Sequence, residues 1–327
     1  MDKKRFIQID IAKWILACLI ILLHLKFNNL FIYVIQQYLS RLGVPLFFIF
    51  SGFFCYKNLE NNYSKWLVFK KYVLRIFRLY LFWGTVYFLP VLKSQYNGNI
   101  TDSVLYLIKE YIFCTPAYLW YLPAVLLGCT LLILFYKNKF TLICFSILSI
   151  LLYIIGVCGN SYAAIINNDT INLYLDHYIT TRNGLFFAPI FISIGAICWS
   201  KGDKIIKLKP FILYIGIILS YLLFCIEVYH VKSLISHDID SSMYFSLPLI
   251  CAMIFCGLLS IKEEKVPDII QNNGSVFREA SIIIYCLQYG IAYILSDYSS
   301  VIIFIITIFI GTMFPVFKKL LIILFKK

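Results

Sequence analysis

Long apolar stretches separated by short polar segments dominate the pattern of this chain. Ten of these stretches are long enough to cross a bilayer as an α-helix, which takes about 20 residues. They cover approximately residues 8–27, 38–57, 72–93, 117–136, 139–158, 184–200, 210–230, 242–261, 279–296 and 299–325. The pattern predicts an all-α polytopic membrane protein: a bundle of about ten transmembrane helices that forms one integral-membrane domain over residues 1–327.

The composition agrees with a membrane protein. Hydrophobic residues make up 61% of the 327 residues and charged residues only 14%, which is far more apolar than a soluble domain of this length. The eleven cysteines lie almost all in apolar stretches, and no CxxC pair or Cys/His ligand spacing occurs. We therefore predict neither a disulfide framework nor a metal site.

The positive charges indicate the orientation in the membrane. Of the 29 lysine and arginine residues, 22 fall in the N-terminal tail and in segments 57–78, 137–139, 201–209, 262–278 and 318–327. These are the tails and every second loop, so the positive-inside rule places both termini in the cytoplasm. The net charge of +13 is thereby explained by topology and contact with lipid headgroups, and no nucleic acid is implied.

The N-terminal stretch combines a basic leader with an apolar core, as a signal peptide does. However, Asp10 and Lys13 interrupt the core, and no small-x-small cleavage site follows. We expect this stretch to remain as the first membrane helix.

Three ionisable residues lie on one face of that first helix. Lys13 and His24 are eleven residues apart, so they differ by only about 20° around the helix and by about 16 Å along it. Asp10 precedes Lys13 by three residues and is placed to form an ion pair with it. Ionisable groups inside a membrane usually face a cavity and mark a pathway or reaction site. The alternative is structural, with Asp10 and Lys13 reaching the inner surface and His24 satisfied by a neighbouring helix.

Five short motifs resemble the acyltransferase 3 family of integral-membrane acyltransferases. In chain order they are Ile9, Asp10, Lys13 and His24; VPLFFIFSGFF with Pro45, Ser51 and Gly52; KKYVLRIFRLY; LWYLPAVLLG with Trp120, Tyr121 and Pro123; and TTRNGLFFAPIFISIG with Arg182, Asn183, Gly184 and Gly195. The last two are also similar to the membrane domain attached to vancomycin-resistance serine racemases, and no racemase domain is recognised in these residues. Two positions depart from the family pattern. Lys13 stands where arginine is common, and Gln288, in SIIIYCLQY, stands where histidine is expected.

The resemblance implies a reaction and its partners. Members of the family O-acylate envelope glycans, so it implies a bacterial cytoplasmic-membrane O-acyltransferase that moves an acyl group, most commonly acetyl, from cytosolic acyl-CoA to a polysaccharide or lipid-linked glycan. No permanently bound cofactor is implied, because acyl-CoA is a co-substrate. The transfer needs a base for the hydroxyl proton and positive groups for the oxyanion. His24 is the candidate base or acyl carrier; Lys13 is expected to hold a donor phosphate or polarise a carbonyl, and Asp10 to orient Lys13.

Other residues are candidates for binding, each with a structural alternative. For the donor they are Lys71, Arg75, Arg78 and Ser51; for the acceptor they are Trp120, Tyr121, Arg182 and Asn183. The basic residues also fit plain topology, and Ser51 with Gly52 fits a close helix contact. The aromatic pair also fits an interfacial belt, and Arg182 with Asn183 a loop anchor. Glu227 and His230 form another possible acid–base pair, with solvation as the alternative.

Two rival functions come from other classes. Intramembrane charges also fit a transporter or flippase of lipid-linked glycan, although no internal duplication is found. A non-catalytic membrane partner of a glycan-synthesis complex is the third possibility.

Overall fold

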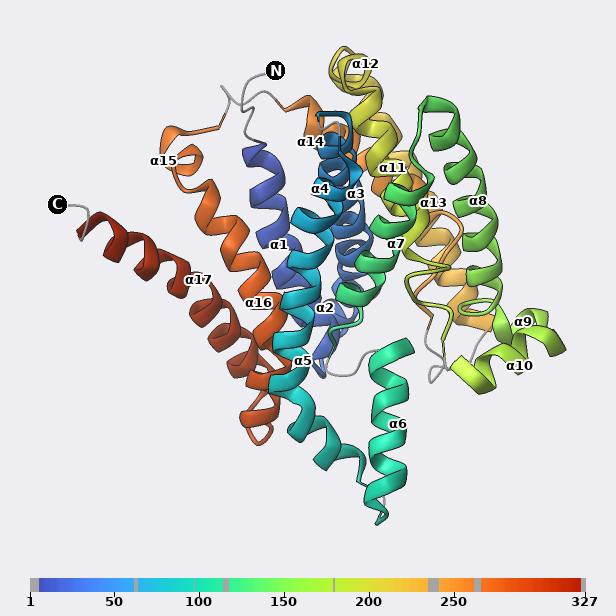
Figure 1. The fold of residues 1–327 in the computed structure, drawn as a ribbon, viewed down its shortest axis with the longest axis vertical. Coiled ribbons are helices and arrows are strands. Elements are labelled where there is room, and N and C mark those ends of the chain that lie inside the picture. The colour runs from blue at the N-terminus through green and yellow to red at the C-terminus, as the bar shows by residue number, and fades with distance from the viewer. Residues whose placement is uncertain are drawn as a thin grey trace. The chain divides into compact units, whose positions relative to one another are not determined.

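The structure is a computed structural model that describes residues 6–61, 64–96, 98–113, 118–178, 180–234, 241–261 and 266–324. All regular secondary structure in these residues is helical (Figure 1). Six helical runs among them are long and apolar enough to cross a membrane: Ile7–His24, Leu30–Asn61, Lys65–Ser94, Lys139–Cys158, Pro210–Leu234 and Ser300–Leu321. The chain is therefore an all-α, multi-pass membrane protein.

A helix lies within each of the ten predicted apolar stretches, but not every one is long enough to span a bilayer. Helices α7 (Tyr121–Phe135), α11 (Ala188–Ser200) and α14 (Leu247–Ser260) have 15, 13 and 14 residues. At 1.5 Å per residue they reach about 20 Å, short of a hydrocarbon core of about 30 Å. Helix α16 (Gly274–Ile294) is longer but carries Arg278 and Glu279. Ten crossings and two cytoplasmic termini accordingly stay predictions.

The chain forms two compact units. The terminal unit comprises Met1–Val44 and Gly257–Lys327, and the central unit comprises Pro45–Cys256.

Three helices form the core of the terminal unit: α1 (Ile7–His24), α16 and α17 (Ser300–Leu324). Helix α16 follows the short α15 (Asp268–Gln271), packs against α1 and α17, and runs parallel to α1, while α17 returns alongside it (Figure 1). Trp14 on α1 donates a hydrogen bond to Thr312 on α17, 3.1 Å from nitrogen to oxygen. Buried aliphatic side chains of α1, including Leu16, Ile20 and Ile21, fill this unit because they share the faces that the neighbouring helices cover.

A second segment of the terminal unit closes the end of α1. It consists of α2 (Leu30–Val34), a π-helical turn over Ile35–Leu39 and a 3-10 turn over Ser40–Leu42, and it leads into α3 (Gly43–Asn61). The side chain of Asn29 caps α2 by accepting bonds from the amides of Phe31 and Ile32. Helix α2 and the start of the π-helical turn lie between the predicted stretches 8–27 and 38–57, and the 3-10 turn lies at the start of the second stretch.

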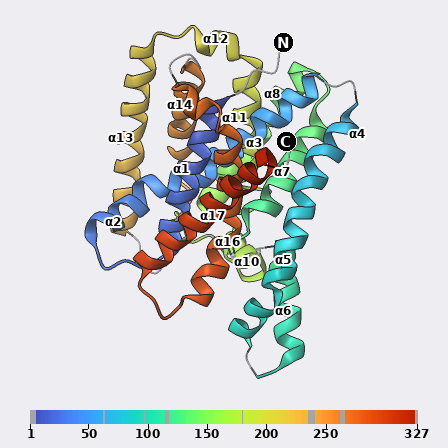
Figure 2. The same ribbon diagram turned by 90° about the vertical axis from the view of Figure 1, so that its left-hand side faces the viewer.

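The central unit contains most of α3 together with α4 (Lys65–Val68), a π-helical turn (Phe69–Val73) and α5 (Leu74–Gln95). It continues through α7, α8 (Lys139–Cys158), α11, α12 (Gly202–Ile206), α13 (Pro210–Leu234) and α14. Figure 2 shows α12 joining the end of α11 to the start of α13. The long α8 begins at a capping box, in which Asn138 and Thr141 each accept from the other's backbone amide.

The two longest predicted loops, 94–116 and 159–183, hold further helices. They are α6 (Ile100–Phe113) in the first loop, and α9 (Ala163–Ile166) and α10 (Asp169–Tyr178) in the second. Two reciprocal hydrogen bonds hold α6 against α5. Tyr80 donates to the carbonyl oxygen of Tyr111 at 2.6 Å, and Tyr111 donates to that of Gly84 at 2.8 Å.

Two glycines of the quoted motifs meet where α3 crosses α11. A Cβ built on Gly52 would lie 2.1 Å from the carbonyl oxygen of Ile192, and one built on Gly195 would lie 2.1 Å from that of Ile49. Only residues without a side chain allow the two backbones to approach this closely. The helix contact expected at Gly52 is therefore confirmed.

Candidate active site

The ionisable stripe of α1 lies within an otherwise apolar helix of the terminal unit. Asp10 and Lys13 form the expected ion pair, with 3.9 Å between the Lys13 nitrogen and the nearer carboxylate oxygen, and each side chain is only 15% exposed. Ala17, Ile20 and Ile21 lie on the same side of the helix and are fully buried. The stripe therefore runs along a face that the protein covers.

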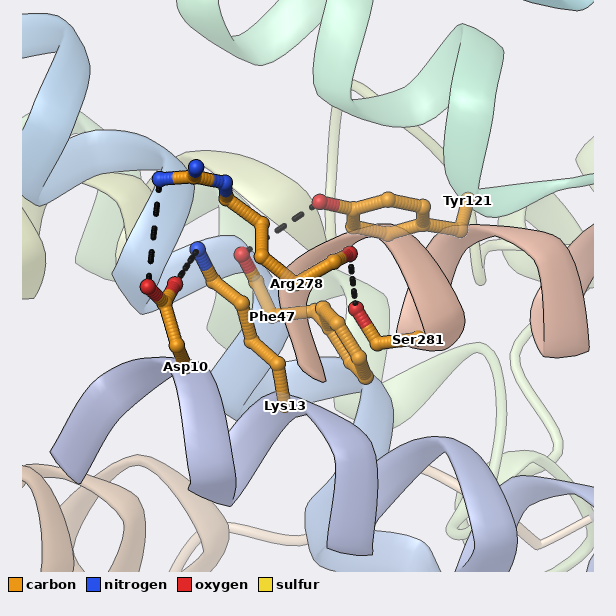
Figure 3. A network of polar contacts seen from close by, with 6 residues as sticks. All are labelled: Asp10, Lys13, Phe47, Tyr121, Arg278 and Ser281. Atoms are coloured by element: carbon orange, nitrogen blue, oxygen red, sulfur yellow. Dashed lines mark hydrogen bonds and ion pairs between the residues drawn. The ribbon is translucent and has the colours of Figure 1, made fainter. Parts of the chain in front are cut away.

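A second cation joins this pair from α16. A guanidinium nitrogen of Arg278 lies 3.8 Å from the other carboxylate oxygen of Asp10, so the carboxylate stands between two positive groups (Figure 3). The two helices approach closely here, since a Cβ built on Gly274 would lie 2.5 Å from the Ile7 side chain and 3.6 Å from the Asp10 carboxylate. One carboxylate thus fixes Lys13 and Arg278 at the start of both helices.

Arg278 belongs to the basic segment 262–278 that the positive-inside rule explains, and that rule does not predict this contact. The signal was available in the spacing of α16, because Arg278, Ser281, Tyr285 and Gln288 recur at intervals of three and four residues and share one helix face. Ser281 in that series is satisfied locally, since its hydroxyl donates to the carbonyl oxygen of Arg278 at 2.9 Å (Figure 3).

His24 lies partly buried in the last turn of α1. The carbonyl groups of such a turn have no partner within the helix. The Gln36 amide donates to two of them, Leu22 and Leu25, at 2.8 Å for Leu25. The Ser300 hydroxyl of α17 also donates to the carbonyl oxygen of Lys26, just beyond the helix. The turn that carries His24 is therefore fixed on two sides.

Three functional groups follow one another along α1: the carboxylate of Asp10, the ammonium of Lys13 and the imidazole of His24. The carboxylate attracts the ammonium and orients it. The imidazole is a side chain that exchanges protons near neutral pH. Such an arrangement can bind an anionic or carbonyl group near Lys13 and move a proton at His24.

In the central unit, Ser51 and Tyr121 form a direct contact. Their hydroxyl oxygens lie 2.8 Å apart, and the Tyr72 hydroxyl donates to the carbonyl oxygen of Ser51 at 3.1 Å. The Tyr121 hydroxyl also donates to the carbonyl oxygen of Phe47 at 3.4 Å (Figure 3). The network ties α3 to α7 and to the turn before α5. It joins a residue predicted for donor binding to one predicted for acceptor binding.

Arg182 and Trp120, both predicted to bind the acceptor, also meet. The guanidinium carbon of Arg182 lies 5.0 Å from the Trp120 ring centroid, which is a cation–π contact. Asn183 anchors its loop, as the structural alternative expects. Its side-chain oxygen accepts from the backbone amides of Leu185 and Phe186, and its side-chain nitrogen donates to the Tyr174 hydroxyl at 3.1 Å. Its role in acceptor binding stays a prediction.

The predicted basic cluster is open to the surroundings. Lys71 lies in the middle of the π-helical turn, Arg75 and Arg78 lie in the first turns of α5, and all three side chains are exposed. No ion pair links them to another residue that the structure describes. They are free to bind an anion, and their role toward a donor phosphate stays a prediction.

Glu227 holds a loop in place. Its carboxylate accepts from the amides of Phe245 and Ser246 at 2.7 and 2.8 Å, from the Ser246 hydroxyl, and from the Tyr162 hydroxyl at 2.9 Å. Burial, and the hydrogen bond to this carboxylate, raise the pKa of Tyr162 above its ordinary value. Glu227 thereby fixes the chain before α14, and His230 is exposed, as the solvation alternative expects.

The fold and this site define a multi-pass, all-α membrane protein. One face of its first helix carries a paired carboxylate and ammonium, Asp10 and Lys13, together with the imidazole of His24. The model of the acyltransferase 3 family, described as an acyltransferase domain, matches residues 6–318. The chain belongs to this family of membrane acyltransferases.

Curated relatives carry the name of another activity. The chain is 30% identical over 275 residues to an amino-acid racemase of Enterococcus faecalis, covering 79% of this chain and 38% of the relative. It is 32% identical over 253 residues to another from the same organism, covering 73% and 34%. It is 30% identical over 228 residues to a serine/alanine racemase of Enterococcus gallinarum, covering 66% and 31%.

The chain thus spans about a third of the length of these curated relatives. No solved structure matches it. Both resemblances expected from the motifs, to the acyltransferase 3 family and to serine racemases, are confirmed.

The charges around Asp10 allow a test of what this cluster contributes. Replacing Asp10→Asn removes the anion that Lys13, which is only 15% exposed, shares with Arg278, which is 52% exposed. We expect a loss of about 1–3 kcal/mol in stability, because the ammonium of Lys13 then stays partly buried without this carboxylate. The measurement is thermal unfolding of the detergent-purified protein.

A matched control is the pair between Lys318 and Glu279. It is shorter, at 2.8 Å, but 54% and 42% exposed, and exposed pairs contribute only about 0–1 kcal/mol. Glu279→Gln should therefore leave the stability nearly unchanged. Equal effects of the two substitutions would show that the Asp10 cluster is a surface ion pair only.

Proposed function

We propose that this chain is an O-acyltransferase of the bacterial cytoplasmic membrane. It transfers an acetyl group from cytosolic acetyl-CoA to a hydroxyl of a cell-surface or lipid-linked polysaccharide. The observation that carries the proposal is the partly buried stripe of Asp10, Lys13 and His24, whose carboxylate stands between two cations in a chain that belongs to an acyltransferase family.

The reaction assigns a role to each residue of the stripe. His24 accepts the proton of the acceptor hydroxyl as its oxygen attacks the thioester carbonyl. The C–S bond then breaks, the CoA thiolate leaves, and it takes up the proton that His24 accepted. Lys13 holds a donor phosphate or polarises the carbonyl, and Asp10 keeps it charged and oriented.

Residues of the central unit are proposed for binding. Lys71, Arg75 and Arg78 are exposed cations suited to the donor phosphates. Arg182 over Trp120 presents a cation and an aromatic face, which is a combination suited to a sugar.

Mass spectrometry of the surface polysaccharide tests this function. Cells with the gene should carry glycan heavier by one acetyl group per modified site, and mild alkali should remove that mass because it cleaves esters. Membranes containing the protein should transfer label from acetyl-CoA to the same glycan.

The same experiment separates the rival functions. A flippase would change the amount of glycan at the surface and leave its ester content alone. Identical ester content with and without the gene, together with no transfer of label, would overturn the proposal.

A further inference from the structure

One polar side chain of α16 is buried without a partner. Gln288 is only 3% exposed, and neither its amide nitrogen nor its amide oxygen has a hydrogen-bond partner in the structure. Gln36, a buried glutamine of the same unit, by contrast donates hydrogen bonds to two backbone carbonyl groups. Burying an amide without hydrogen bonds is unfavourable, so such a group needs a further explanation.

Gln288 belongs to the helix face that meets α1. Arg278, Tyr285 and Gln288 recur at helical spacing on that face, and Arg278 contacts Asp10. Gly274 on the same face contacts Ile7. The unpaired amide therefore lies on the side of α16 that faces the stripe of α1.

The pairing of the two helices gives the depth of Gln288. Gly274 lies beside Ile7, Arg278 beside Asp10, and Phe277 beside Trp14 with ring centroids 6.1 Å apart, so α1 and α16 run in the same direction. Both helices rise about 1.5 Å per residue. Continuing these pairs along the helices brings Gln288 to the depth of residues 20–25, the turn that carries His24.

A carboxamide with both a free donor and a free acceptor is complementary to a secondary amide. The cysteamine arm of CoA carries such an amide. The sulfur and two methylene groups separate it from the thioester carbonyl by about 5 Å, close to one helical turn. If the thioester lies at His24, the cysteamine amide lies about one helical turn away, at a depth that the side chain of Gln288 can reach.

We infer that Gln288 binds the cysteamine amide of the acyl-CoA donor. Its amide nitrogen donates to the carbonyl oxygen of the cysteamine amide, and its own carbonyl oxygen accepts from the N–H. The inference rests on the proposed function and adds a residue that recognises the donor and sets the distance of its thioester from His24.

Two small donors test this contact. S-acetyl-N-acetylcysteamine retains the amide, and S-pentyl thioacetate has the same chain length with methylene groups in its place. We expect wild-type membranes to transfer acetyl from the first with a kcat/KM at least about tenfold higher, because two hydrogen bonds are lost with the second. In the Gln288→Leu protein, the kcat/KM values for the two donors should become nearly equal. The change should come mainly from a higher KM for the donor that carries the amide.

The control is Thr307→Val. Thr307 on α17 is also fully buried, but its hydroxyl donates to the carbonyl oxygen of Ile303 at 2.7 Å within its own helix. Its replacement should leave the donor ratio as in the wild type. Differences in how the two donors partition into lipid are common to all variants, so only the change in ratio is interpreted.

Folding is followed by thermal unfolding in detergent. Gln288→Leu removes a buried amide that has no hydrogen-bond partner, so the unfolding midpoint of the protein should not fall. Gln288→Met, which keeps the length of the side chain, replaces it if the leucine variant is unstable.

The outcomes are distinct. A donor ratio that is unchanged in an active Gln288→Leu protein overturns this inference and leaves the proposed function standing. A change confined to KM for the glycan also overturns it, because the amide would then bind the acceptor hydroxyl. Absence of transfer in the wild type, from these donors and from acetyl-CoA, overturns both.

Discussion

Replacing His24→Ala is expected to abolish measurable transfer of acetyl label to the glycan. Removing a general base usually lowers a rate by about 10²- to 10⁴-fold, because the hydroxyl must then lose its proton without help. The variant should still reach the membrane in normal amount, since His24 is only partly buried and the turn that carries it is fixed by Gln36 and Ser300. The measurement is initial transfer from labelled acetyl-CoA in membranes matched for protein content.

His230→Ala is the matched control. His230 lies near the end of α13 with an exposed side chain, so its loss should change neither transfer nor stability. Transfer at the wild-type rate in the His24→Ala protein would remove the assigned base. Equal losses in both variants would point to a general effect of losing a histidine.

The stripe of α1 was predictable because it depends on local geometry alone. Once residues 8–27 are helical, the positions of Asp10, Lys13 and His24 around the helix follow, and the Asp10–Lys13 pair is a contact within one turn. The contact of Arg278 with Asp10 was not predictable in this way. It joins residues far apart in the sequence, and it exists because α16 packs against α1.

The helices in the long polar loops were missed for a related reason. Helix α6 is short and mixes apolar with polar residues, so its pattern does not reach the length of a membrane span. Its position depends on Tyr80 and Tyr111, whose hydrogen bonds form only when α5 is beside it. Hydropathy shows which segments enter the membrane, and tertiary contacts decide what the connecting segments do.

The helix contact at Gly52 was likewise predictable only in part from the sequence. The presence of a small residue predicted that another helix would approach, but the sequence does not tell which one. The structure pairs Gly52 with the backbone of α11, and Gly195 of α11 with the backbone of α3. Two motifs more than a hundred residues apart are thus two halves of one crossing.

Gly195→Ala is therefore expected to destabilise the protein by about 3 kcal/mol, at the upper end of what overpacking usually costs. Its new Cβ would lie 2.1 Å from the Ile49 carbonyl oxygen and 2.6 Å from the Phe53 amide nitrogen. These are backbone atoms of one helix, so relief requires moving α3 as a whole and not only a side chain. The measurement is the thermal-unfolding midpoint of the detergent-purified protein, followed with the yield of folded protein.

Gly202→Ala is the control. It makes the same glycine-to-alanine change in a helix, but at a position where the new Cβ meets no neighbouring atom. A Cβ on Gly202, the first residue of α12, meets nothing within 4 Å. Within helices alanine is generally favoured over glycine by about 1 kcal/mol, so this substitution should be neutral or stabilising. The midpoint should consequently fall for Gly195→Ala and not for Gly202→Ala. A neutral Gly195→Ala protein would mean that α3 and α11 do not cross at these glycines, and the path of α3 past Ser51 and Tyr121 would then differ as well.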